Sequence, residues 1–257
     1  MKYLTVVKND QESKKVEEKI REKIKLEYSK ESPDYVIAIG GDGTIIQASH
    51  SYPNAIIFGV HTGHLGFYAN YDVDKLDELI NDINSNTFET LDIEYISCEV
   101  IDKNNNVLLL GEALNEVTIL TPLRTLILDV NIDGKHFETF RGTGLCVSTT
   151  FGSTGYNKSL HGAVVDTSLD AFQLTEIAGI NSNVYRTLAS PLVLSKNRVI
   201  ELVNSNNMEK AYITVDFLAK EISDFKAIRI KSSNDKIKMA YHEYEDHLKR
   251  IKRAFLK

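Results

Sequence analysis

The sequence predicts an α/β N-terminal domain with a parallel sheet, followed by a mostly antiparallel β domain. Up to about residue 83, short apolar runs alternate with segments of helical periodicity, which is typical of βαβ units. Beyond residue 88 the apolar residues recur at every second position, and turn-forming residues separate the runs. No repeat or low-complexity linker separates the two parts, so we expect a boundary near residue 91 that is only a change of pattern.

Three short apolar strands are predicted in the first part, at residues 3–7, 35–39 and 55–60. Between the first two strands, apolar residues lie four positions apart, at Val16, Ile20, Ile24 and Tyr28. This spacing predicts one helix over residues 11–28, with a single apolar stripe that packs on the sheet. Two more helices are predicted, a short one after residue 44 and one over residues 73–83.

The second part is predicted to consist of strands and tight turns. Asp133-Gly134 lies between the apolar runs 125–132 and 135–140, which is a strong hairpin signal. Further strands are predicted at residues 91–95, 107–110, 212–215 and 227–230. Residues 171–178 are predicted as a brief helix. A basic amphipathic segment over residues 243–256 closes the chain, and its expected apolar face is Leu248, Ile251, Ala254 and Phe255.

Composition excludes several classes of function. Thirty Lys and Arg against thirty-six Asp and Glu give a formal net charge of −6, which argues against binding nucleic acid by phosphate neutralisation. Cys98 and Cys146 lie in no CxxC pattern, so neither a zinc site nor a disulfide framework is predicted. No apolar run is long enough for a signal peptide or a membrane span. We therefore expect a soluble, cytoplasmic protein that binds neither nucleic acid nor membranes.

The turn Gly40-Gly41-Asp42-Gly43-Thr44 follows an apolar strand and leads into a helix. Ligands of open parallel sheets bind beyond the carboxyl ends of the strands, and amides at a helix start attract anions. Glycines let the backbone approach a ligand closely, so a phosphate-bearing ligand is predicted. A carboxylate beside phosphates is repulsive unless it binds a metal or accepts a proton from a hydroxyl nucleophile. Asp42 thus indicates phosphoryl transfer, with a plain tight turn as the alternative interpretation.

Several common motifs do not fit the glycines of this chain. There is no GxxxxGK[ST] sequence, and neither Gly40 nor Gly142 begins a GxGxxG sequence. Gly152-Ser153-Thr154-Gly155 does not match the GxSxG sequence of hydrolases. His61 and His64 lie in a glycine loop without an obvious third ligand, so no metal site is predicted.

A second glycine-rich tract runs from Arg141-Gly142-Thr143-Gly144 through residues 148–157. Its small hydroxyl side chains and amides can read the edge of a nucleobase, and Phe151 or Tyr156 can supply an aromatic wall. A long surface loop is the alternative interpretation. Asn115-Glu116 forms a third polar island between apolar strand residues.

Together these segments resemble the NAD kinase family. The resemblance rests on Gly40-Gly41-Asp42-Gly43-Thr44, Thr62-Gly63-His64-Leu65-Gly66-Phe67, Asn115-Glu116, the tract from Arg141 to Leu160, Ser190-Pro191-Leu192 and Val215-Asp216. Diacylglycerol-type lipid kinases share the Gly-Gly-Asp-Gly-Thr element, and phosphofructokinases carry a similar turn. The histidine-bearing glycine loop and the Gly-Ser-Thr-Gly-Tyr-Asn segment favour NAD kinase.

The resemblance implies a kinase that uses ATP, with Mg²⁺, to phosphorylate the adenosine 2′-hydroxyl of NAD, giving NADP. Asp42 would activate that hydroxyl, and Asn115 and Glu116 would hold the ribose hydroxyls. The other nucleotide-binding positions would be Gly41, Gly43 and Thr44 in the glycine turn, Phe67 and Tyr68 lining the dinucleotide site, Thr154, Gly155 and Tyr156 at the adenine, Thr143, Ser159, Ala178 and Tyr185 on the nicotinamide side, and Asp216.

The resemblance also implies how the chain is divided. Residues 1–91 and 238–257 would form an α/β nucleotide-binding domain, to which the C-terminal segment returns. Residues 92–237 would form a β-rich domain for the dinucleotide substrate. The partners implied are small-molecule nucleotides and further copies of the chain, in a dimer or a homotetramer.

Three segments depart from the family pattern. Thr143 stands where the family has the aspartate of Arg-Gly-Asp-Gly, and Thr150-Phe151-Gly152 replaces part of a Thr-Pro-Ser-Gly sequence. Asp216 is followed by Phe217 instead of histidine. These changes concern the nicotinamide side and leave the chemistry expected of Asp42 untouched. They leave open a catalytically weak dinucleotide-binding homologue and a diacylglycerol-type lipid kinase as alternatives.

Overall fold

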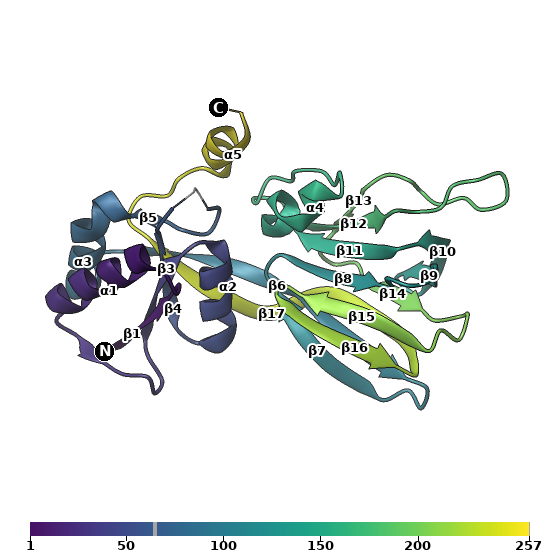
Figure 1. The fold of residues 1–257 in the computed structure, drawn as a ribbon, viewed down its shortest axis with the longest axis horizontal. Helices are drawn as coiled ribbons and strands as arrows, with labels where there is room; N and C mark the ends of the chain where they lie inside the picture. The colour runs from purple at the N-terminus through teal and green to yellow at the C-terminus, as the bar shows by residue number, and fades with distance from the viewer. Residues whose placement is uncertain (64–65, 257) are drawn as a thin grey trace. The chain divides into compact units, whose positions relative to one another are not determined.

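The computed structural model describes residues 1–63 and 66–256. The chain divides into two compact units, one formed by Met1–Ile93 with Asp235–Lys257 and the other by Glu94–Asn234. These bounds lie within three residues of the domain limits expected from the sequence. Two long paired strands, β6 (Glu89–Asp102) and β17 (Phe225–Tyr241), run through both units (Figure 1).

The first unit is built on a parallel sheet in the order β2-β1-β3-β4. Its strands are β1 (Lys2–Val7), β2 (Glu27–Tyr28), β3 (Tyr35–Gly40), β4 (Ile56–His61) and β5 (Tyr71–Asp72). Every residue of β3 is buried, as expected for a strand covered on both faces. The parallel sheet predicted for this part of the chain is confirmed.

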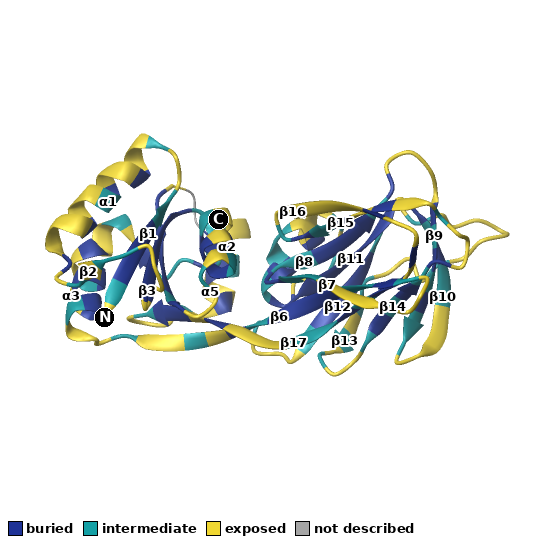
Figure 2. Ribbon diagram, turned by 90° about the horizontal axis from the view of Figure 1, so that it is seen from below, coloured by how far each residue is buried: buried dark blue, intermediate teal, exposed yellow. Residues whose placement is uncertain are grey.

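The helices of this unit cover both faces of the sheet. They are α1 (Gln11–Lys23), α2 (Asp42–Ser51), the 3₁₀ turn η1 (Val73–Lys75), α3 (Leu76–Ser85) and α5 (His247–Phe255). α1 and α3 share one core cluster with the strands, and α2 lies on the opposite face (Figure 1). Figure 2 shows buried residues along the strands and exposed outer faces on α1 and α3.

The helix predicted over residues 11–28 is too long. α1 ends at Lys23, and Ile24 has extended backbone with φ −75° and ψ 129°. Tyr28 lies in β2, where its ring packs edge-on against Tyr3 at 5.4 Å between centroids. The four-residue spacing of apolar positions extends beyond the end of α1 because Tyr28, an apolar position of the next strand, lies at the same spacing by coincidence.

The second unit consists of two antiparallel sheets. One has the order β13-β12-β11-β8-β15-β16, and the other contains β10-β9-β14 joined to β17, β6 and β7. Apart from β6 and β17, the strands are β7 (Val107–Ala113), β8 (Glu116–Leu120), β9 (Leu126–Ile132), β10 (Lys135–Gly142), β11 (Gly144–Thr149), β12 (Ala171–Ile177), β13 (Leu192–Ser195), β14 (Ile200–Val203), β15 (Lys210–Val215) and β16 (Leu218–Ser223). One core cluster draws residues from both sheets, and the predicted antiparallel architecture is confirmed.

Two local predictions in this unit had opposite outcomes. The hairpin is confirmed, since Asp133 and Gly134 have φ values of +50° and +73° between paired strands. The brief helix over residues 171–178 is wrong, because β12 occupies these residues. Phe172 and Leu174 face the core. Gln173 and Thr175 lie on the other face, where they are also buried and their side chains make hydrogen bonds. A strand buried on both faces shows no alternation, so its pattern does not distinguish it from a helix.

The closing helix α5 is present, but the predicted apolar face is not the buried one. Leu248 is 57% exposed and Phe255 is 38% exposed, whereas His247 and Arg250 are each 5% exposed. The guanidinium of Arg250 finds acceptors inside the first unit, which compensates for its burial. Within the described ranges, none of the helices has the length and apolar character needed to cross a membrane.

Candidate active site

The glycine turn places the start of a helix at the carboxyl end of a parallel strand. β3 ends at Gly40, and α2 begins after Gly41 with no side-chain cap on its first amides. A Cβ at Gly40 would lie 2.5 Å from the Thr44 hydroxyl oxygen, so only glycine fits there. A Cβ at Gly41 or Gly43 would meet no atom within 4 Å. The backbone here is therefore open to an approaching anion.

The Asp42 carboxylate is held by the backbone of a neighbouring loop. The Phe67 amide N–H donates to both carboxylate oxygens, at 3.0 and 2.9 Å, and the Tyr68 amide N–H donates to Oδ1 at 3.0 Å. A Cβ at Gly66 would lie 2.4 Å from the same Oδ1, so the loop approaches closely only because this residue is glycine. The structure thus brings together three residues that the sequence assigned to the site.

The side chains of this loop are covered within the first unit. The Phe67 ring stacks on Phe255 of α5, with centroids 5.6 Å apart, and lies 5.9 Å from the His247 ring. Tyr68 is 3% exposed. The backbone of this loop donates hydrogen bonds to Asp42, while its aromatic side chains are packed within the first unit.

In the second unit, Asp216 organises the polar island Asn115-Glu116 at the start of β8. Its carboxylate accepts hydrogen bonds from the amide N–H groups of Leu114 at 2.9 Å, Asn115 at 2.8 Å and Glu116 at 3.2 Å. Asp216 itself has a left-handed backbone with φ +51°. Its carboxylate therefore supports the two residues predicted to bind a ribose.

Glu116 carries the most perturbed carboxyl group of this cluster. Burial, and secondarily the nearby Asp216, raise the pKa of Glu116 to about 7. Among the described residues, its buried Oε2 atom has no hydrogen-bond partner. A buried carboxyl oxygen without a partner is costly, and a ligand hydroxyl would supply the missing hydrogen bond.

The second glycine-rich tract folds against the same polar island. The Thr149 amide donates to the Asn115 carbonyl at 2.9 Å, and the Gly152 amide donates to the Thr149 hydroxyl at 2.9 Å. A Cβ at Gly152 would lie 2.0 Å from the Asn115 carbonyl oxygen, so glycine is required. A Cβ at Gly155 would lie 3.5 Å from Oε2 of Glu116 and 3.8 Å from Nδ2 of Asn115. The structure thus brings the predicted adenine and ribose residues into one cluster.

The residues that follow form two short turns, η2 (Phe151–Thr154) and α4 (Tyr156–Ser159). The Thr154 hydroxyl donates to the Phe151 carbonyl at 3.2 Å, so it is engaged locally. Tyr156 is 43% exposed, and Ser159 is exposed at the end of α4. An exposed tyrosine beside the cluster can still provide an aromatic wall for a base.

The predicted nicotinamide side lies at the adjoining ends of β11 and β12. Thr143 is exposed, and its amide donates to the Ile177 carbonyl at 3.0 Å, next to Ala178 with its left-handed φ of +49°. The Tyr185 ring lies 4.4 Å from the Arg141 guanidinium carbon, in a cation–π contact. The structure therefore places Thr143 and Ala178 together and Tyr185 beside Arg141.

Comparison with known proteins identifies the family. Residues 3–88 match the ATP-NAD kinase N-terminal domain, and residues 114–241 match the ATP-NAD kinase C-terminal domain. The chain is 40% identical over 266 residues to the NAD kinase of Staphylococcus aureus (strain JH9), covering 100% of this chain and 98% of that protein. This chain belongs to the NAD kinase family. The motif resemblance is thereby confirmed, and neither alternative, the catalytically weak dinucleotide-binding homologue or the lipid kinase, is favoured.

Two solved structures share the NAD kinase fold with this chain. Yeast NADH kinase complexed with NADH superposes with a TM-score of 0.81 at 18% identity, covering 100% of this chain and 87% of that chain. An NAD kinase from Archaeoglobus fulgidus in complex with ATP superposes with a TM-score of 0.77 at 26% identity, covering 98% and 99%.

Sequence analysis underrated one residue and missed another in this NAD kinase family member. His61, at the end of β4 and paired in register with Gly40, is 9% exposed, and its ring nitrogens have no hydrogen-bond partner among the described residues. The sequence pattern presents His61 only as a candidate metal ligand with His64, which lies with Leu65 outside the described residues. The missed residue, Glu176, accepts hydrogen bonds from the Thr187 hydroxyl at 2.7 Å and the Ala189 amide at 2.9 Å. No sequence signal links it to that loop.

Proposed function

We propose that this protein phosphorylates the adenosine 2′-hydroxyl of NAD with ATP, giving NADP and ADP. The observation that carries the proposal is the Asp42 carboxylate, held by the Phe67 and Tyr68 amides at the start of α2. A carboxylate fixed in this way can accept the proton of the 2′-hydroxyl as its oxygen bonds to the γ-phosphorus and the bond to ADP breaks. The open backbone at Gly41 and Gly43, followed by Thr44, supports phosphate binding beside it.

The cluster in the second unit supports recognition of the adenosine. The unpartnered Oε2 of Glu116 fits a ribose hydroxyl donor, and Asn115 lies next to it on a backbone held by Asp216. Thr154 and Gly155 border this cluster, and Tyr156 offers a ring for the adenine. We assign Thr143, Ser159, Ala178 and Tyr185 to the nicotinamide side.

Mg²⁺ belongs to the proposal as the companion of ATP. In residues 1–63 and 66–256, no group of three or more His, Cys, Asp or Glu side chains could hold a metal ion. Mg²⁺ that is bound mainly through substrate phosphates and water needs only one or two protein carboxylates, so the residues present fit this use. When bound, the ion would neutralise charge on the phosphates during transfer.

We further propose a cytoplasmic protein that assembles as a dimer or homotetramer. The edge strand β7 exposes three consecutive apolar residues, Val107 at 54%, Leu108 at 65% and Leu109 at 57%. Such a run supports contact with a further copy of the chain. Light scattering coupled to size-exclusion chromatography tests the assembly.

A coupled assay tests the function directly. Purified protein is incubated with NAD and Mg-ATP, and NADP is detected with an NADP-specific dehydrogenase. We expect NADP to accumulate with both substrates and not when either is omitted. NAD binding measured by calorimetry without any NADP formation would overturn the kinase proposal and favour the dinucleotide-binding homologue.

A further inference from the structure

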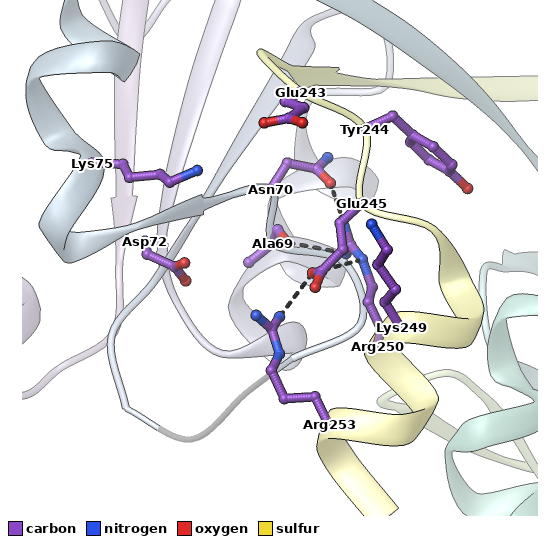
Figure 3. A pocket seen from close by; sticks show the side chains of 10 residues that line it. All are labelled: Ala69, Asn70, Asp72, Lys75, Glu243, Tyr244, Glu245, Lys249, Arg250 and Arg253. Atoms are coloured by element: carbon purple, nitrogen blue, oxygen red, sulfur yellow. Dashed lines mark hydrogen bonds and ion pairs between the residues drawn. The ribbon is translucent and has the colours of Figure 1, made fainter.

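Arg250 is the one arginine of α5 that is nearly inaccessible, with 5% exposure. Burial lowers the pKa of its guanidinium, since a charge removed from water is disfavoured. Such a group is retained only where acceptors surround it. Figure 3 shows the side chain reaching from α5 toward residues 69 and 70.

Apart from the Glu245 carboxylate, which lies 3.6 Å from its Nε, the Arg250 guanidinium meets its acceptors at residues 67–70, in and just after the loop that holds Asp42. Its Nη1 donates to the Phe67 carbonyl oxygen at 2.7 Å and to the Ala69 carbonyl oxygen at 3.0 Å. Its Nη2 donates to the Asn70 side-chain oxygen. The guanidinium therefore fixes this loop at three residues, Phe67, Ala69 and Asn70, with its rigid fork of donors.

One peptide group connects Arg250 to Asp42. The Phe67 carbonyl and the Tyr68 amide N–H belong to the same planar peptide. Arg250 donates to the oxygen of this peptide at 2.7 Å, and the N–H on its other side donates to Asp42 Oδ1 at 3.0 Å. Because consecutive hydrogen bonds polarise one another, a cation on the carbonyl strengthens the N–H as a donor.

We infer that Arg250 is a positioning residue for Asp42, acting through the peptide between residues 67 and 68. Its guanidinium donates to oxygens of Phe67, Ala69 and Asn70, so it acts on Asp42 through the backbone of this loop. Its guanidinium orients the amide that holds the Asp42 carboxylate, and so sets the direction in which the free carboxylate lone pairs face. The inference rests on the role proposed for Asp42 in phosphoryl transfer.

Arg253 provides a matched control on the same helix. It lies one turn further along α5, and its Nη2 pairs with Glu245 at 2.8 Å, while Arg250 Nε lies 3.6 Å from the same carboxylate. The hydrogen bonds to Phe67 and Ala69 come from Arg250. Replacing Arg253 therefore removes a cation from α5 without removing the contact to the peptide.

The first measurement compares steady-state kinetics of wild type, Arg250→Met, Arg250→Lys and Arg253→Met. We expect Arg250→Met to lower kcat by about 10–100-fold, with KM for NAD and ATP changed by less than about threefold, because misplacement affects the chemical step. Arg250→Lys should recover part of kcat, since one ammonium can still reach a carbonyl. Arg253→Met should stay within about twofold of wild type. A wild-type kcat in Arg250→Met would overturn the inference.

The second measurement does not depend on turnover. Amide hydrogen exchange by NMR should be at least about tenfold faster at Phe67 and Tyr68 in Arg250→Met and faster by a smaller factor in Arg250→Lys, with β3 amides unchanged as the control for folding. Unchanged exchange at Tyr68 in Arg250→Lys would refute the inference, even if Arg250→Met fails to fold. Absence of NADP formation by the wild type would refute the proposed function instead.

Discussion

Asp216 and Glu116 hold each other through reciprocal hydrogen bonds. The Glu116 amide donates to Asp216 Oδ1 at 3.2 Å, and the Asp216 amide donates to the Glu116 carbonyl oxygen at 3.0 Å. Each residue thus fixes the backbone of the other, and the Asp216 carboxylate contributes to the raised pKa of Glu116. A half-buried carboxyl group with a raised pKa and an unpartnered oxygen, on a backbone fixed in this way, marks a candidate binding site.

The affinity for NAD should depend on pH through Glu116. If the ionised carboxylate accepts the ribose hydrogen bonds, a pKa of about 7 means that affinity falls as the pH is lowered through that value. Between pH 8 and pH 6 the ionised fraction falls by about tenfold, and the Kd for NAD should rise accordingly. Calorimetric titrations with NAD at both pH values measure this change in Kd. The Glu116→Gln variant should bind NAD more weakly, and its affinity should not depend on pH in this range. If the variant shows the same pH dependence as wild type, Glu116 is not its source.

The same carboxyl group should reduce stability at neutral and alkaline pH. Its pKa is raised from the ordinary value of 4.5 to about 7, so the folded state binds more protons than the unfolded state between these values. The free energy of unfolding therefore falls as pH rises through this window. Glu116→Gln should be more stable than wild type at pH 8, by about 1–3 kcal/mol, and no more stable at pH 4.5. Urea unfolding at both pH values tests this, and a pH-independent difference would contradict it.

Asp42→Asn should lower kcat by about 10²–10⁴-fold while NAD still binds, because it removes the proton acceptor with little change of shape. Single-turnover NADP formation and calorimetry provide the two readouts. Asp77→Asn is the control, since Asp77 is an exposed carboxylate paired with Lys23 in the same unit. If Asp42→Asn keeps half of the wild-type kcat, another group accepts the proton.

Asp216→Asn should weaken NAD binding by about 1–3 kcal/mol, because an amide cannot accept all three N–H groups that now meet the carboxylate. Asparagine tolerates the left-handed φ of +51° at this position, so the backbone conformation should survive. Asp224→Asn is a matched control, with φ +53° and an exposed ion pair to Lys103. Equal Kd values for NAD in both variants would remove Asp216 from the support of the site.

Thr143→Asp should tighten NAD binding by about 1 kcal/mol, since an exposed carboxylate complements the positive nicotinamide ring at little desolvation cost. Thr143 is exposed at the predicted nicotinamide side. The gain should appear in NAD titrations and be absent with adenosine, which lacks that half. A gain of equal size with adenosine would show that Thr143 lies elsewhere relative to the ligand.

Sequence patterns predicted those parts of the fold that local chemistry determines. The glycine turn before Asp42 and the Asp133-Gly134 hairpin need particular backbone angles, which few residues other than glycine and aspartate adopt. The strand over residues 171–177 was missed because neighbours on both faces bury it. Family resemblance, rather than periodicity, supplied Asn115 and Glu116.

Supporting contacts between distant residues were beyond the reach of sequence patterns. The Asp216 carboxylate meets the Glu116 amide across 100 positions of the chain, and Arg250 meets Phe67 across 183. Their partners are backbone amides and carbonyls, which every residue carries, so no residue type at either end signals the contact. Only the folded chain identifies them.

The return of the chain to its first unit has a consequence for biosynthesis. The second unit is one continuous stretch, Glu94–Asn234, whereas the first requires segments on both sides of it, Met1–Ile93 and Asp235–Lys257. During translation the second unit can therefore complete its core before α5 has been synthesised. Until then the first unit lacks one of its helices. The loop that orients Asp42 becomes complete only after Arg250 has left the ribosome, 183 residues behind Phe67. The order in which the units mature should thus reverse the usual N-terminal-first sequence of folding.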